Sequence, residues 1–154
     1  MATTTTDRVE KEILLRAPRA RVWRALTDSK EFGAWFQVSF TEPFRPGATV
    51  HGRITYPGKE DLEMTIVIEA MEPERLFSFR WHPYAVDPAK DYSNEPMTLI
   101  EFKLQDADGG TRLRLSESGF DGIPIERRAE ALRMNDGGWT AQMKAIERYL
   151  AQNP

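Results

Sequence analysis

The chain has 154 residues, of which 40% are hydrophobic and 29% are charged, so its composition is that of one ordinary globular domain. Its net charge is −3, with 21 basic and 24 acidic residues interleaved along the chain, and this argues against nucleic acid as a partner. The sequence contains no cysteine, which excludes disulfide bonds, thiolate nucleophiles and cysteine-bound metal clusters.

The N-terminal residues 1–7 are polar and rich in threonine. This composition predicts a disordered lead, followed by a single domain over residues 8–154. The lead lacks the apolar segment of a secretory signal, and no apolar run approaches the length of a membrane span. We therefore expect a cytoplasmic protein without a membrane span.

The first predicted elements are one strand and two helices. Residues 9–16 place apolar side chains between charged ones, which predicts a strand. Pro18 breaks this pattern and suits the first turn of a helix, so a helix is predicted over residues 18–27. Asp28 or Ser29 can cap a second, shorter helix that carries two phenylalanines and a tryptophan.

Apolar and polar residues then alternate in five further segments, which are separated by turns rich in glycine, proline and acidic residues. The predicted strands are residues 49–56, 62–71, 76–82, 98–104 and 111–119. Such alternation gives each strand one apolar face, which is typical of an antiparallel sheet packed on a core. The irregular segment between residues 82 and 96 has the length of a binding loop or lid.

The C-terminal region predicts a long helix. Trp139, Met143, Ile146 and Leu150 recur at spacings of four, three and four residues, which gives one apolar stripe. Two adjacent glycines within residues 135–138 predict a break or kink ahead of this stripe. The order of elements predicts an α+β fold in which the C-terminal helix covers the apolar face of a curved sheet.

Glu117 is unusual because it continues the inward-facing series of Leu113 and Leu115. A carboxylate on an apolar face must find partners or shift its pKa. Two interpretations stay open at this point. Glu117 anchors the polar end of a ligand, or it lies past the core and meets water or backbone N–H groups.

Large aromatic side chains are numerous for one sheet and a few helices. They can be ordinary core residues, or some can line a cavity between the sheet and the C-terminal helix, which would be the default small-molecule site. We predict that Trp81 and Trp139 face each other across this cavity, with a polar partner such as Glu117 near one indole. The predicted ligand-binding residues are Trp35, Phe36, Tyr56, Met64, Ile66, Phe79, Trp81, Ile100, Phe102, Leu115, Glu117, Trp139 and Met143.

The sequence offers little for metal or cofactor chemistry. His51 and His82 are the only histidines, and neither stands in a zinc-binding pattern. No phosphate-binding or dinucleotide motif is present, so we expect no metal and no cofactor. Catalytic residues stay unknown. An enzyme using the cavity would take Glu117, His82, Tyr56 or Tyr84 as acid or base.

Several short motifs together resemble the START-like, or Bet v 1-like, superfamily (SRPBCC). The chain is similar to its bacterial branch named after the C-terminal domain of the activator of Hsp90 ATPase. The motifs are Ala17-Pro18 with Val22-Trp23, Leu26-Thr27-Asp28, Trp35-Phe36, residues 73–81, residues 117–120 and Gly138-Trp139. The resemblance implies a helix-grip fold, in which a curved antiparallel sheet of about six or seven strands wraps around a long C-terminal helix.

The same resemblance implies three functions. Members of the superfamily bind lipids, sterols, polyketides or other apolar small molecules, so binding of such a molecule in the cavity is the first hypothesis. The second is an enzyme that uses the same cavity. The third is a protein-interaction module of the Hsp90 activator type, with a chaperone or a second copy as partner.

Overall fold

The computed structural model describes residues 8–83 and 89–154. The disordered lead predicted at residues 1–7 and the candidate Tyr84 lie outside the described residues.

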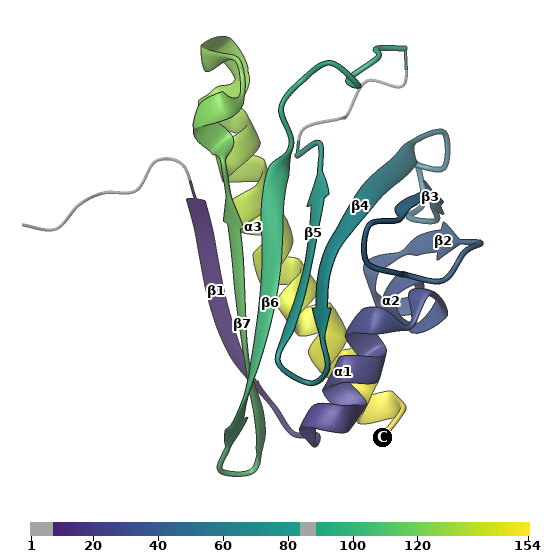
Figure 1. Ribbon diagram of the computed structural model, residues 1–154, viewed down its shortest axis with the longest axis vertical. Coiled ribbons are helices and arrows are strands. Elements are labelled where there is room, and N and C mark those ends of the chain that lie inside the picture. Colours follow the sequence, from purple (N-terminus) through teal and green to yellow (C-terminus); the bar gives the residue numbers. More distant parts are fainter. Residues whose placement is uncertain (1–7, 84–88) are drawn as a thin grey trace, which may run out of the picture.

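One antiparallel sheet of seven strands forms the body of the protein (Figure 1). Its order is β1-β7-β6-β5-β4-β3-β2, so the first strand lies at one edge and the second strand lies at the other. The strands are β1 (Arg8–Leu15), β2 (Val38–Phe40), β3 (Thr49–Ile54), β4 (Glu63–Glu72), β5 (Leu76–Trp81), β6 (Thr98–Ala107) and β7 (Gly110–Ser118). The short β2 was not predicted, because three residues are too few to show an alternating pattern.

Two short helices carry the chain from β1 to the far edge of the sheet. These are α1 (Arg19–Thr27) and α2 (Ser29–Phe36). As predicted, Asp28 caps α2, because its Oδ1 accepts hydrogen bonds from the backbone N–H groups of Lys30 and Glu31 at 3.0 and 3.1 Å. At the other end of α2, Gln37 adopts a left-handed conformation with φ 64°, which turns the chain into β2.

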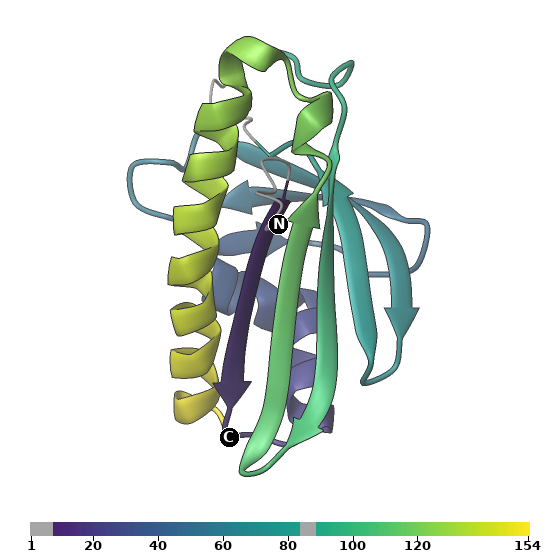
Figure 2. The same ribbon diagram turned by 90° about the vertical axis from the view of Figure 1, so that its left-hand side faces the viewer.

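A short 3-10 helix, η1 (Phe120–Gly122), leads to the long helix α3 (Ile125–Gln152). This helix lies behind the sheet in Figure 1 and runs along the length of β1 in Figure 2. Its apolar stripe is buried against the sheet, with Trp139 at 2% and Ile146 at 0% exposure. The predicted α+β helix-grip fold is therefore confirmed, with seven strands and two short helices after the first strand.

The predicted break at residues 135–138 is wrong. Helix α3 runs without interruption for 28 residues, and Gly137 and Gly138 are both exposed. Each glycine costs the helix about 1 kcal/mol relative to alanine. The apolar stripe around them buries several large side chains, each of which contributes about 1.5–3 kcal/mol, so tertiary packing keeps the helix intact.

Replacing Gly137 by alanine is expected to raise the free energy of unfolding by about 1 kcal/mol, since the helix gains the better helix former. A Cβ at this position meets no atom within 4 Å. Thermal denaturation should show an increase in Tm of about 2–4 °C.

Gly33→Ala is the matched control, because a Cβ there would lie 2.1 Å from the backbone oxygen of Val38. This second variant should be destabilised. A Gly137→Ala protein that is less stable than wild type would contradict an unbroken helix at this position.

Candidate functional site

Trp81 and Trp139 face each other, but they do so in direct contact. Their ring centroids are 5.6 Å apart and their planes meet at 27°, which is a stacked arrangement. Phe36 contacts both indoles, with centroids 5.8 Å from each. The prediction that an interior cavity separates the two tryptophans is therefore wrong, because the rings themselves fill this space.

Glu117, on β7, is completely buried and accepts hydrogen bonds from four side chains. The indole N–H of Trp81 donates to Oε2 and that of Trp139 donates to Oε1, both at 2.7 Å. The hydroxyl of Thr98 donates to Oε2 at 2.5 Å. The amide of Asn135 donates to both oxygens, at 3.0 and 3.1 Å.

These donors come from β5, β6 and α3, so the Glu117 carboxylate on β7 joins the helix to the sheet. Burial raises the pKa of Glu117 above its ordinary value, and the four donors oppose this shift because they favour the ionised form. Five hydrogen bonds already occupy the acceptor positions of the two oxygens. The interpretation of Glu117 as an acid that meets water at a strand end is therefore wrong. In this arrangement the two oxygens of Glu117 also have no acceptor position left for a ligand.

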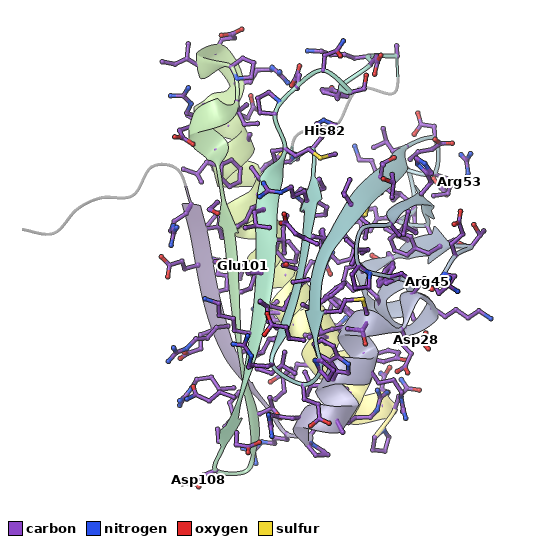
Figure 3. All side chains as sticks on the ribbon, in the orientation of Figure 1. Asp28, Arg45, Arg53, His82, Glu101 and Asp108 are labelled. Atoms are coloured by element: carbon purple, nitrogen blue, oxygen red, sulfur yellow. The ribbon has the colours of Figure 1, made fainter. Side chains whose placement is uncertain are left out.

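The two histidines lie apart from this cluster. His82 directly follows β5 where the long loop begins (Figure 3), and its Nε2 lies 3.1 Å from the backbone oxygen of Glu95. His51 Nδ1 lies 2.9 Å from the hydroxyl of Thr65 on an exposed strand face. Among residues 8–83 and 89–154, no group of three or more His, Asp or Glu side chains is placed to hold a metal ion.

A groove of about 630 Å³ lies beside α3, between the helix and the β2 edge of the sheet. One wall comes from the end of α2, from β2 and from the β3–β4 hairpin. Its residues are Ala34, Trp35, Phe36, Gln37, Val38, Ile54, Tyr56, Lys59 and Met64. The other wall is one side of α3, with Gly138, Ala141, Gln142, Ala145, Arg148, Tyr149 and Gln152.

Small side chains on α3 explain why this space is open. Gly138, Ala141 and Ala145 follow one another at spacings of three and four residues, so they share one side of the helix. The adjacent stripe, which contains Trp139 and Met143, points into the core and is filled. Glycine and alanine are too short to reach from α3 to α2, so a groove remains between the two helices. This stripe of small residues is the sequence signal that was missed, since Gly138 was not interpreted together with Ala141 and Ala145.

The predicted ligand-binding residues divide into two groups. Trp35, Phe36, Tyr56 and Met64 line the groove. The other nine do not line it and lie in or against the packed interior; they are Ile66, Phe79, Trp81, Ile100, Phe102, Leu115, Glu117, Trp139 and Met143. Ligand binding by any of these residues stays a prediction.

A second hollow, of about 460 Å³, lies between the β6–β7 hairpin and the segment that enters α1. Arg19 Nε and Asp106 Oδ1, which both line it, form an ion pair at 2.8 Å. No aromatic side chain of the described residues lines this hollow. The groove beside α3 is therefore the better candidate for an apolar ligand.

A seven-stranded antiparallel sheet that wraps around one long C-terminal helix, with an aromatic groove on the side of that helix, defines a START-like helix-grip protein. Residues 16–151 match the family model described as "Activator of Hsp90 ATPase homolog 1-like protein". The chain belongs to this family.

Solved structures support the same fold. Protein MLL2253 from Mesorhizobium loti is 25% identical, with a TM-score of 0.74 over 96% of this chain and 98% of that chain. Protein NE0264 from Nitrosomonas europaea is 18% identical, with a TM-score of 0.74 and complete coverage of both chains. DynU16, a putative protein in the dynemicin biosynthetic locus, is 22% identical, with a TM-score of 0.73 over 94% of this chain and 47% of that chain.

Comparison with curated proteins gave no match. In the part of the chain that the structure describes, no helix is both long enough and apolar enough to cross a membrane.

Proposed function

We propose that this protein binds a small, mostly apolar molecule, aromatic or lipid-like, in the groove between α3 and the α2–β2 segment. The family suggests a ligand-binding or activator-like role. The observation that carries the proposal is the groove itself, whose volume of about 630 Å³ falls within the range of about 300–1,000 Å³ that small-molecule sites occupy.

The chemistry of the walls fits an apolar ligand. The indole N–H of Trp35 donates to the backbone oxygen of Ala25 at 2.9 Å, so the polar edge of this ring is already satisfied inside the protein. Tyr56 is 54% exposed at the edge of the groove. An apolar ligand that covers this ring would remove apolar area from water, which is the main favourable term in such binding.

The protein-interaction alternative predicts an exposed apolar patch near Trp35 and Phe36 or on the segment 82–96, of which residues 84–88 lie outside the described residues. The side chains of Trp35 and Phe36 are only 4% and 9% exposed. In the described residues, the exposed large hydrophobic side chains are spread over four places in the sequence: Leu14, Tyr56, Ile125 and Met134. Scattered exposed hydrophobic residues are normal on a protein surface and do not form a docking patch. The cytoplasmic location and a chaperone partner both stay predictions.

Filling the groove should abolish binding. Ala141 lines the groove and is exposed, so the Ala141→Phe variant can place a ring there without displacing core side chains. In titrations of isotope-labelled protein followed by NMR, 1-decanol or 2-naphthol should shift groove resonances saturably in the wild type. We expect Ala141→Phe to weaken this binding by at least about tenfold, since the ring takes the volume of the ligand.

Ala129→Phe serves as the control, because Ala129 is an exposed α3 residue outside the groove. This variant should bind both probes like the wild type. If the wild type shows no saturable shifts, or if Ala141→Phe binds as well as Ala129→Phe, then the groove is not the binding site.

A further inference from the structure

We infer that the ligand of this groove carries an anionic group, such as a carboxylate, on its apolar body. The inference rests on the proposed function and adds the chemical class of the ligand. It is carried by Lys59 and Arg148, which place one cation on each wall of the groove.

Neither cation has a partner for its charge among the described residues. The side chains of Lys59 and Arg148 are exposed and form no ion pair there, whereas Arg53, on the same hairpin as Lys59, pairs with Glu63 at 3.2 Å. Glu60, the neighbour of Lys59, accepts a hydrogen bond from the backbone N–H of Gly58 at 2.7 Å. Because Lys59 forms no ion pair with the described acidic residues of this hairpin, its ammonium group stays available to a ligand in the groove.

The charge of the residues that line the groove is one-sided. No Asp or Glu of the described residues lines it, although acidic residues outnumber basic ones, 24 to 21, in the whole chain. Glu31 is hydrogen-bonded to a groove residue, because it accepts the hydroxyl of Tyr149 at 2.8 Å. Glu31 is neutralised by Arg21 and Arg24, which lie 2.8 and 2.7 Å away. An anion in the groove therefore lies near two cations that form no ion pair with the described residues, and no described acidic residue lines the groove.

The two side chains also suit an amphipathic molecule. Lysine and arginine lay long apolar stems along an apolar surface and keep their charged ends in water. The stems can cover part of an apolar ligand body while the charged ends attract its anionic group at the open side of the groove. The attraction is between solvent-exposed charges, so it is modest and screened by salt.

The test compares decanoate with 1-decanol, which have the same chain length and differ in charge at pH 7.5. Dissociation constants are measured by NMR titration for the wild type, Lys59→Gln, Arg148→Gln and the double variant. We expect wild-type protein to bind decanoate about tenfold more tightly than 1-decanol. Each single substitution should reduce this preference for decanoate by about threefold. The double variant should bind both probes equally, and 0.5 M NaCl should reduce the wild-type preference.

Lys144→Gln is the matched control, because Lys144 is an exposed cation of α3 that does not line the groove. This variant should keep the wild-type preference for decanoate. Equal wild-type affinities for decanoate and 1-decanol would overturn the anionic class and leave the groove as a site for neutral ligands. A loss of preference in Lys144→Gln equal to that in the double variant would also overturn it. Saturable binding of neither probe would overturn the proposed function together with this inference.

Discussion

Replacing Trp139 by alanine is expected to lower the free energy of unfolding by about 3–5 kcal/mol. The indole is 2% exposed, stacks on Trp81 and contacts Phe36 and Phe102, with ring centroids 5.6–5.8 Å away. Truncation leaves a cavity among these rings and removes one of the hydrogen bonds to Glu117. Urea or guanidinium denaturation measures the loss.

Trp139→Phe is the matched control, because it keeps an aromatic ring and removes the N–H donor. Trp139→Phe should lower the free energy of unfolding by less, about 1–3 kcal/mol, since most of the ring packing survives. If Trp139→Ala cost less than about 2 kcal/mol, the two tryptophans would not form the packed contact that joins α3 to the sheet.

Replacing Glu117 by glutamine is expected to lower the free energy of unfolding by about 2–3 kcal/mol. Each carboxylate oxygen accepts an indole N–H at 2.7 Å, from Trp81 or from Trp139. The amide of glutamine cannot accept at its nitrogen, so one buried donor loses its partner in either orientation. Glu147→Gln, which makes the same charge change at an exposed position of α3, should stay within about 0.5 kcal/mol of the wild type.

The contribution of Glu117 to the free energy of unfolding should also depend on pH. Because burial raises the pKa of Glu117, the folded protein holds a proton that the unfolded chain releases above its ordinary pKa of 4.5. The contribution of Glu117 to stability is therefore largest below this value and decreases as the pH rises toward the pKa of the folded state. The difference between wild type and Glu117→Gln in unfolding free energy should decrease as the pH rises above 4.5. A difference that grows with pH would show that the pKa is lowered in the folded protein.

Much of the fold could be predicted because its signals are local. Period-two alternation marks the long strands, and the Asp28 cap marks the start of α2. The continuity of α3 could not be predicted in this way. Gly137 and Gly138 lower the helix propensity locally, and this is visible in the sequence. The stabilisation that outweighs it comes from burying apolar side chains of α3 against the sheet, which the helix sequence alone does not show.

The candidate site was harder to predict for a related reason. Strand alternation correctly placed Trp81 and Glu117 on inward faces, and helical spacing did the same for Trp139. Whether inward side chains enclose a void depends on how their shapes fit together. Here the indoles stack and the carboxylate joins them. The open groove lies beside the adjacent side of α3, which carries the small side chains of Ala141 and Ala145.

Intermolecular nuclear Overhauser effects between 1-decanol and the isotope-labelled protein test the central claim most directly. The groove predicts cross-peaks from the alkyl chain to the Trp35 ring and to the methyl groups of Ala141 and Ala145, which line its two walls. Cross-peaks to the buried Trp139 and Met143 instead, or none at saturating probe, would contradict binding in the groove.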